Sequence, residues 1–133
     1  MERQGVIDRL LDHYQHPRNA GPLADADLVV VGGQPDCGDQ VTVYLRIDDA
    51  HRIAQMHFTG QGCTISQASA SILSELVVGM EIADAARLDD EWMLGILGRD
   101  VVHNRSRCAT LALSTLQTAL ARLPTDQRNA VAS

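Results

Sequence analysis

The sequence predicts an α+β domain in which a run of strands is followed by a run of helices. Residues 41–47 alternate apolar and polar side chains, and residues 54–58 repeat this alternation beyond a turn-rich loop, which is typical of an antiparallel hairpin. From residue 65 onward, apolar residues instead recur at helical spacing. With 133 residues, of which 45% are apolar, the chain is long enough for one core and too short for two.

The N-terminal part of the chain contains one predicted helix and one predicted short strand. Residues 4–15 place apolar side chains on one face and charged ones on the other, and Pro17 ends this helix because it cannot donate a backbone hydrogen bond. Residues 16–22 are rich in turn formers, so we expect an exposed loop. Residues 28–31 are a short β-branched run ended by two glycines, which predicts a strand.

Helices are predicted over most of the chain beyond residue 65. The first carries many small side chains, which allow close packing, and we expect Gly79 to cap its C-terminus. A weaker helical pattern covers residues 82–88. Asp89 or Asp90 is expected to cap a further short helix.

The last predicted helix begins near Ser106, a good N-cap residue, and ends before Pro124. We expect residues 125–133 to fray. No repeat or low-complexity tract divides the sequence. Residues 1–124 are therefore predicted to form a single domain.

Composition excludes several classes of function. Eleven basic and seventeen acidic residues give a formal charge of −6, and the basic residues form no cluster that would attract a phosphate backbone. Aromatic residues make up 3% of the chain, too few for stacking on single-stranded nucleic acid. No apolar run approaches the roughly 20 residues that span a bilayer, and no secretory or transit segment is recognisable. We expect a cytoplasmic protein that binds neither nucleic acid nor membrane.

Three cysteines, Cys37, Cys63 and Cys108, are the most informative residues. An odd number cannot close into internal disulfides alone, which favours thiol chemistry. Cys37 and Asp39 are one residue apart, so in an extended backbone both side chains point the same way, and Gly38 leaves the space between them open. Cys63 and Cys108 are predicted at helix starts, where the helix dipole favours the thiolate, so we expect both thiols to be acidic.

Three thiolates and one carboxylate suit either a tetrahedral zinc ion or one open edge of an iron–sulfur cluster. The chain has no Cys-x-x-Cys pair, so the fold would have to gather these ligands from separate loops. Two other interpretations remain open from the residues alone. In the first, the cysteines are three unrelated small core residues. In the second, one of them is a nucleophile activated by a histidine. The histidines are His13, His16, His51, His57 and His103.

Four motifs, in order along nearly the whole chain, resemble the IscU/SufU/NifU-type iron–sulfur scaffold family. They are Tyr14–Gly21 (YQHPRNAG), Cys37–Asp39 (CGD), Gly60–Ser71 (GQGCTISQASAS) and Arg107–Leu111 (RCATL). The resemblance implies a three-stranded antiparallel sheet packed by about four to five helices. It also implies a metal site formed by Cys37, Asp39, Cys63 and Cys108.

In function, the resemblance implies a scaffold that takes sulfur from a cysteine desulfurase, binds iron, builds a labile [2Fe-2S] cluster and passes it to apo-proteins. Such a protein is a carrier and not a catalyst. The desulfurase is expected to meet the surface around Tyr14, Pro17 and Arg18. The alternative is a zinc-dependent sulfurtransferase, in which Zn²⁺ occupies the same four residues and Cys108 accepts persulfide from a SufS-type desulfurase.

The chain departs from both branches of the family. Arg107 precedes the third cysteine, as in the SufU branch, where the IscU branch has a histidine. Arginine cannot coordinate a metal, but it can stabilise a thiolate or pair with Asp39. The interval from Cys63 to Cys108 lacks the SufU insertion and is short, as in IscU. Residues 99–103 replace the Leu-Pro-Pro-Val-Lys motif of IscU, so a dedicated chaperone is not implied.

Overall fold

The computed structural model describes residues 2–34 and 38–123. Cys37 and the tail 125–133 therefore lie outside the described residues. In chain order the elements are α1 (Arg3–Gln15), β1 (Leu28–Gln34), β2 (Asp39–Ile47), β3 (Ile53–Gln61), α2 (Thr64–Leu76), α3 (Ile82–Ala86), α4 (Asp90–Leu97), α5 (Arg99–Val102), the 3-10 turn η2 (His103–Arg105) and α6 (Ser106–Ala121).

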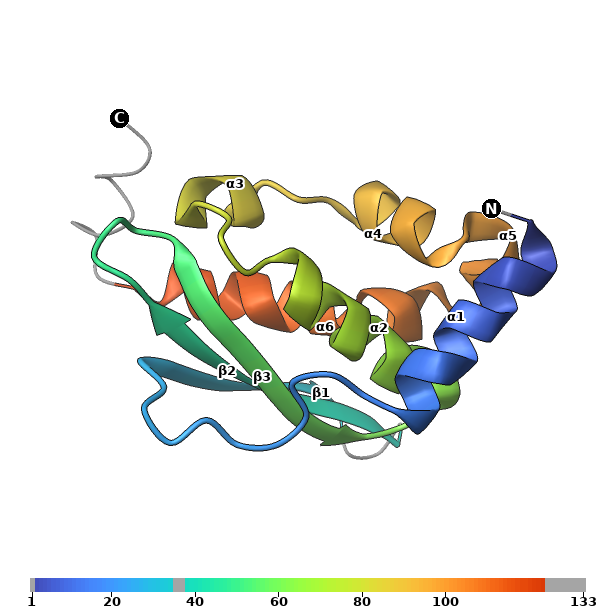
Figure 1. Cartoon of the computed structure of the whole chain (residues 1–133), viewed down its shortest axis with the longest axis horizontal. Coiled ribbons are helices and arrows are strands. Elements are labelled where there is room, and N and C mark those ends of the chain that lie inside the picture. The colour runs from blue at the N-terminus through green and yellow to red at the C-terminus, as the bar shows by residue number, and fades with distance from the viewer. Residues whose placement is uncertain (1, 35–37, 124–133) are drawn as a thin grey trace.

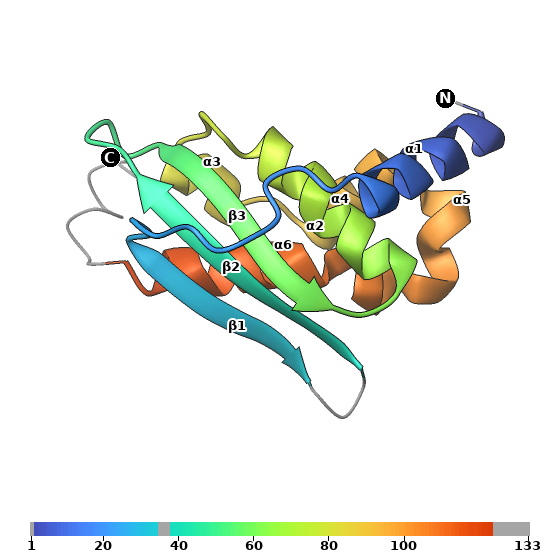
Figure 2. The ribbon, with the colours of Figure 1, turned by 60° about the horizontal axis from the view of Figure 1, so that its bottom comes forward.

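The three strands form one antiparallel sheet in the order β1-β2-β3, which confirms the predicted α+β fold. The alternation in β2 has the expected cause, since Val41, Val43 and Leu45 are all buried on the inner face. Helices α2 and α6 pack on this face, and Figures 1 and 2 show the sheet as one layer with the helices as the other.

Helix α2 is the central helix of the second layer and contacts α1, β3 and α6. Its small side chains allow this close packing, and Ala68, Ser69, Ala70 and Ser71 are all buried. The buried hydroxyls are satisfied locally; Ser69, for example, donates a 3.0 Å hydrogen bond to the Ser66 carbonyl. The sequence prediction of a helix suited to close packing is confirmed.

A hydrogen bond fastens α1 to α2. His13, buried on the inner side of α1, lies with its Nδ1 2.8 Å from the Ser71 hydroxyl. The same hydroxyl accepts the Arg18 backbone N–H at 2.9 Å. One buried serine therefore holds both the end of α1 and the loop that follows it.

Several predicted boundaries are corrected. Strand β1 continues through the two glycines to Gln34. Gly79 does not cap α2, because the C-cap is Val77 and Gly79 instead donates its N–H to the Ile53 carbonyl. Helix α3 ends at Ala86, two residues earlier than the predicted pattern.

At α4 and α6, one predicted cap is confirmed and one is displaced. Asp89 caps α4 by accepting the Trp92 N–H at 2.8 Å, as predicted. Ser106 is the first residue of α6 and Arg105 is its N-cap. The short segments α5 and η2 precede it and were not predicted. None of the described helices has the length and apolar composition needed to cross a membrane.

Candidate metal centre

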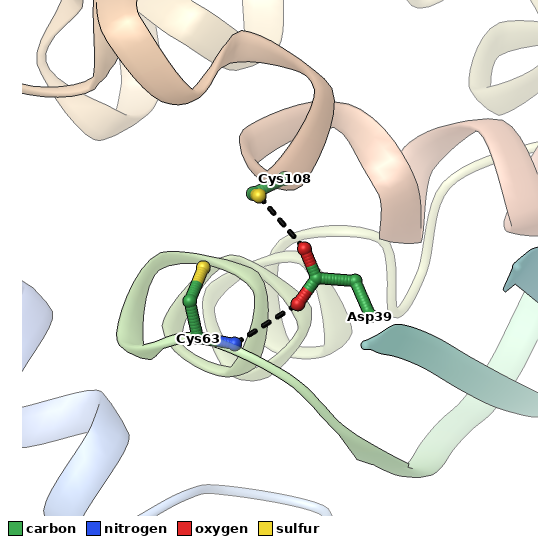
Figure 3. A group of neighbouring side chains, drawn as sticks. All are labelled: Asp39, Cys63 and Cys108. Carbon is green, nitrogen blue, oxygen red and sulfur yellow. Dashed lines mark hydrogen bonds between the residues drawn. The ribbon is translucent and has the colours of Figure 1, made fainter. Parts of the chain in front are cut away.

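Three of the four predicted ligands come together at one end of the sheet. Asp39 is the first residue of β2, Cys63 is the N-cap of α2, and Cys108 lies in the first turn of α6. Figure 3 shows their side chains pointing toward one another from these three elements. The expected positions of both cysteines at helix starts are confirmed.

The carboxylate of Asp39 lies between the two cysteines. Its Oδ1 accepts the Cys63 backbone N–H at 2.9 Å, and its Oδ2 accepts the Cys108 thiol at 2.8 Å (Figure 3). One carboxylate oxygen and the two sulfur atoms all lie within 4.8 Å of one another. All three residues are partly buried, so the group is sheltered but reachable from solvent.

The local structure explains why Asp39 comes so close to Cys63. Gly62 immediately precedes the N-cap, and a Cβ at this position would overlap Asp39 Oδ1 and lie 2.6 Å from the Ser66 hydroxyl. The glycine beside Cys63 therefore makes room for the carboxylate. The Cys63 sulfur also accepts the Ser66 N–H at 3.5 Å, as an N-cap side chain does.

Hydrogen bonds hold Asp39 in its ionised form. The Cys108 thiol makes the largest contribution to lowering the pKa of this carboxyl, and burial opposes it. The Cys63 N–H and the Ser66 hydroxyl lower the pKa further, as does the positive charge of Arg105. Asp39 is therefore a charged acceptor that is ready to bind a cation.

The predicted acidic thiol at Cys108 is wrong for the metal-free chain. Burial raises the pKa of the Cys108 thiol to about 12, and the hydrogen bond to Asp39, the neighbouring Cys63 and the charge of Asp39 add to the effect. Burial, together with a carboxylate that accepts the S–H proton, outweighs the effect of the helix dipole on the pKa of this thiol. A bound cation would reverse this balance, because metal binding displaces the thiol proton.

The structure also corrects the backbone argument for Cys37. Gly38 has a φ of 80°, a left-handed conformation, so the backbone at Gly38 is not the extended one on which the prediction rested. Cys37 itself lies outside the described residues. Its membership of the site stays a prediction.

Arg107 is exposed, and its side chain makes no hydrogen bond or ion pair with the residues that the structure describes. The cation that affects the pKa of Asp39 is instead Arg105, the N-cap of α6. Sequence reasoning missed Arg105 and also Ser66. The signal for Ser66 was its place three residues after an N-cap, where a side chain folds back toward the helix start.

The histidine-activated nucleophile finds no support in the described part of the chain. There, neither Cys63 nor Cys108 has a hydrogen bond to a histidine. His13 is bonded to Ser71, and His103 to the Asp100 carbonyl. Two thiols and a carboxylate match instead the donor set that zinc and iron–sulfur centres take.

The sequence of the chain is matched by the model of a known family. The model of the NifU-like N-terminal domain matches residues 6–130, and the chain therefore belongs to that family.

Two similar proteins show the range of activities that relatives carry. The chain is 34% identical over 113 residues to the iron-sulfur cluster assembly scaffold protein IscU 1 of Archaeoglobus fulgidus, covering 85% of this chain and 72% of the relative. It is 32% identical over 130 residues to the zinc-dependent sulfurtransferase SufU of Bacillus subtilis, covering 85% of this chain and 87% of the relative.

A solved structure agrees in fold. The N-terminal part of a nitrogen-fixing NifU-like protein from Brucella abortus superposes with a TM-score of 0.70 at 22% identity, over 94% of this chain and 98% of that one. At this identity the likeness supports the architecture.

Proposed function

We propose that this chain is an iron–sulfur cluster assembly scaffold. It receives sulfur from a cysteine desulfurase, binds iron, holds a labile [2Fe-2S] cluster and transfers it to apo-proteins. The observation that carries the proposal is the Asp39 carboxylate, hydrogen-bonded to the Cys63 N–H and the Cys108 thiol at the meeting point of three elements. The IscU 1 relative, which is named a scaffold, supports it.

In this proposal the cluster is cargo, and its ligands are Cys37, Asp39, Cys63 and Cys108. Thiolates are the soft donors that iron–sulfur clusters prefer, and a carboxylate oxygen is harder and binds more weakly. Asp39 is therefore the ligand that lets go first. When it does, the Cys63 N–H still holds the other carboxylate oxygen, Oδ1.

The desulfurase is proposed to dock beside the centre, on the surface that contains Tyr14, Pro17 and Arg18. Tyr14 is 45% exposed on α1 and so offers an aromatic side chain to a partner. Arg18 is fastened to Asp12 at 2.6 Å, and the loop is held by Ser71. A rigid exposed loop suits recognition. The receiving apo-proteins are the second class of partner.

A zinc-dependent sulfurtransferase is the second candidate, favoured by the similarity to SufU and by Arg107 in the place before Cys108. Here Zn²⁺ would be held by the same four residues. The Cys108 thiolate would attack the outer sulfur of the desulfurase persulfide, forming a Cys108 persulfide and releasing the desulfurase cysteine as a thiolate. Only sulfane sulfur moves in this step. Arg107 immediately precedes Cys108 in the sequence, and its side chain is exposed.

Anaerobic reconstitution separates the two functions. The full chain is incubated with ferrous iron, sulfide and a thiol reductant, with and without zinc, and its absorbance, iron and acid-labile sulfide are measured. A scaffold yields a chain with bound iron and acid-labile sulfide in about equal amounts, as a [2Fe-2S] cluster requires. It then passes this cluster to an apo-ferredoxin. Recovery of a zinc-loaded, cluster-free chain under every condition would reject the scaffold and leave the sulfurtransferase.

The role of Asp39 is tested by Asp39→Ala, with Asp49→Ala as the control. Asp49 is an exposed carboxylate in the β2–β3 loop, and it is not one of the proposed ligands. We expect Asp39→Ala to retain its cluster and transfer it to apo-ferredoxin about tenfold more slowly, because the weakest ligand has been removed. Transfer at the wild-type rate would contradict this role.

A further inference from the structure

The two oxygens of the Asp39 carboxylate have different partners. Oδ2 faces the Cys108 thiol at 2.8 Å. Oδ1 faces the start of α2, where the Cys63 N–H donates at 2.9 Å and the Ser66 hydroxyl lies 3.3 Å away. One oxygen is thus turned to the sulfur side of the site and the other is held by the helix start.

Ser66 is placed to act on this carboxylate. It is the third residue of α2 and 6% exposed, so solvent competes little for hydrogen bonds with its hydroxyl. The hydroxyl also lies 3.0 Å from the Cys63 carbonyl, and since it has one proton it donates to that carbonyl or to Asp39 Oδ1 at any moment. Donation to a charged carboxylate is the stronger of the two bonds.

Gly62 leaves room for the contact between Ser66 and Asp39. A side chain at position 62 would collide with Asp39 Oδ1 and come within 2.6 Å of the Ser66 hydroxyl, and Gly62 avoids both. Ser66 also touches Cys63, because its N–H donates to the Cys63 sulfur at 3.5 Å. Its side chain and backbone therefore reach two of the proposed ligands.

We propose that Ser66 is a positioning residue for the metal centre. It anchors Oδ1 of Asp39 to the start of α2, so that Asp39 presents Oδ2 toward the sulfur of Cys108 as a single ligand atom. This inference rests on the metal site of the proposed function, and Ser66 is not itself a ligand in it.

Loss of the hydroxyl leaves Oδ1 with the Cys63 N–H and frees the carboxylate to rotate. Removing a hydrogen-bond partner of a metal ligand typically costs about 10- to 100-fold in metal affinity. Because the Cys63 N–H remains, we expect the lower end of this range. The effect should appear as zinc loss about tenfold faster than from the wild-type chain.

The test measures zinc release from the full zinc-loaded chain to a chromogenic chelator in excess. Ser66→Ala removes the hydroxyl, and Ser66→Val and Ser66→Thr are a pair of similar shape that differ in having it. Ser69→Ala is the matched control, since Ser69 is another buried serine of α2 but donates to the Ser66 carbonyl and not to Asp39. We expect faster release from Ser66→Ala and Ser66→Val, and rates near wild type from Ser66→Thr and Ser69→Ala.

Cobalt substitution provides a second readout. With Co²⁺ in place of zinc, the thiolate charge-transfer bands should keep their intensity in Ser66→Ala, because the thiolates are retained, while the ligand-field bands shift as Asp39 changes its orientation. Thermal unfolding of the metal-free variants checks folding, and if Ser66→Ala is unfolded the Val and Thr pair decides.

Each outcome has a definite meaning. Release from Ser66→Ala and Ser66→Val at the wild-type rate would overturn the inference, as would equal acceleration in Ser69→Ala, which would show a general effect on α2. A wild-type chain that binds neither zinc nor cobalt would overturn the metal site and this inference with it. A wild-type chain that binds zinc normally while Ser66 proves irrelevant would leave the proposed function standing.

Discussion

The Cys108 thiol is the group whose chemistry this structure predicts most specifically. In the metal-free chain, burial and the hydrogen bond to Asp39 raise its pKa to about 12, against an ordinary value of 9.0. The thiolate is the reactive form, so at pH 8 the reactive fraction falls about 1,000-fold. Each thiolate is also more nucleophilic at higher pKa, by about 20-fold for a Brønsted coefficient of 0.4–0.5. We therefore expect alkylation of Cys108 about 50-fold slower than that of an unperturbed thiol.

Asp39→Ala should release part of this inhibition. The substitution removes the S–H acceptor and its negative charge but leaves burial, the largest cause, in place. By the same reasoning we expect alkylation of Cys108 to become faster at pH 8, by less than the full factor of about 50, because burial remains. The assay is iodoacetamide labelling in the presence of EDTA, followed by peptide mass spectrometry that resolves the three cysteines.

Asp49→Ala serves as the control, because it removes an exposed carboxylate in the β2–β3 loop. An unchanged Cys108 rate in Asp39→Ala, or an equal increase in the control, would refute the assignment of part of the raised pKa to Asp39. Saturating zinc should protect Cys108 in the wild-type chain, which ties the same thiol to the proposed metal centre.

Three further predictions concern packing and pH. Gly62→Ala should weaken zinc binding at least about tenfold, because the added Cβ overlaps the Asp39 carboxylate. The control is Gly95→Ala, whose added Cβ meets no atom within 4 Å and lies in helix α4. This variant should bind zinc normally and unfold at a slightly higher temperature. Burial lowers the pKa of His13 from 6.5, so as the pH falls the imidazole is protonated in the unfolded chain before it is protonated in the folded one. The free energy of unfolding, measured in urea, should therefore fall as the pH drops below about 6.5. A flat profile between pH 7 and 5 would contradict this. Ser71→Ala leaves a buried imidazole nitrogen and a backbone N–H without their partner and should cost about 1–3 kcal/mol in urea unfolding, against little change for the exposed Ser114→Ala.

The fold was largely predictable because its signals are local. A period of two in residues 41–47 and a helical period after residue 65 report which face of each element is buried, and both agree with the structure. The errors fall at element ends, as at Gly79, where long-range contacts decide the outcome. Its N–H bonds to Ile53, a residue 26 positions earlier, which no local pattern records.

The sequence indicated three residues that the structure brings together, Asp39, Cys63 and Cys108, but it did not indicate their electrostatics. Cys63 and Cys108 could be placed at helix starts from sequence, and the helix dipole then indicated acidic thiols. The structure buries Cys108 and places Asp39 2.8 Å from its thiol, and burial and this carboxylate together raise the pKa of the thiol despite the helix end. A sequence pattern carries no distance between residues 69 positions apart.

Side-chain type and short-range periodicity were enough to predict the kinds of elements, their order and the candidate cysteine and aspartate donors. The tertiary structure decided how the donors meet. The packing of α2 and α6 on the sheet turns Oδ2 of Asp39 toward Cys108 and Oδ1 toward Ser66, and it makes Arg105 rather than Arg107 the cation that affects the pKa of Asp39. Electrostatic and hydrogen-bond energies fall steeply with distance, so these roles depend on differences of a few ångströms that arise when the chain folds.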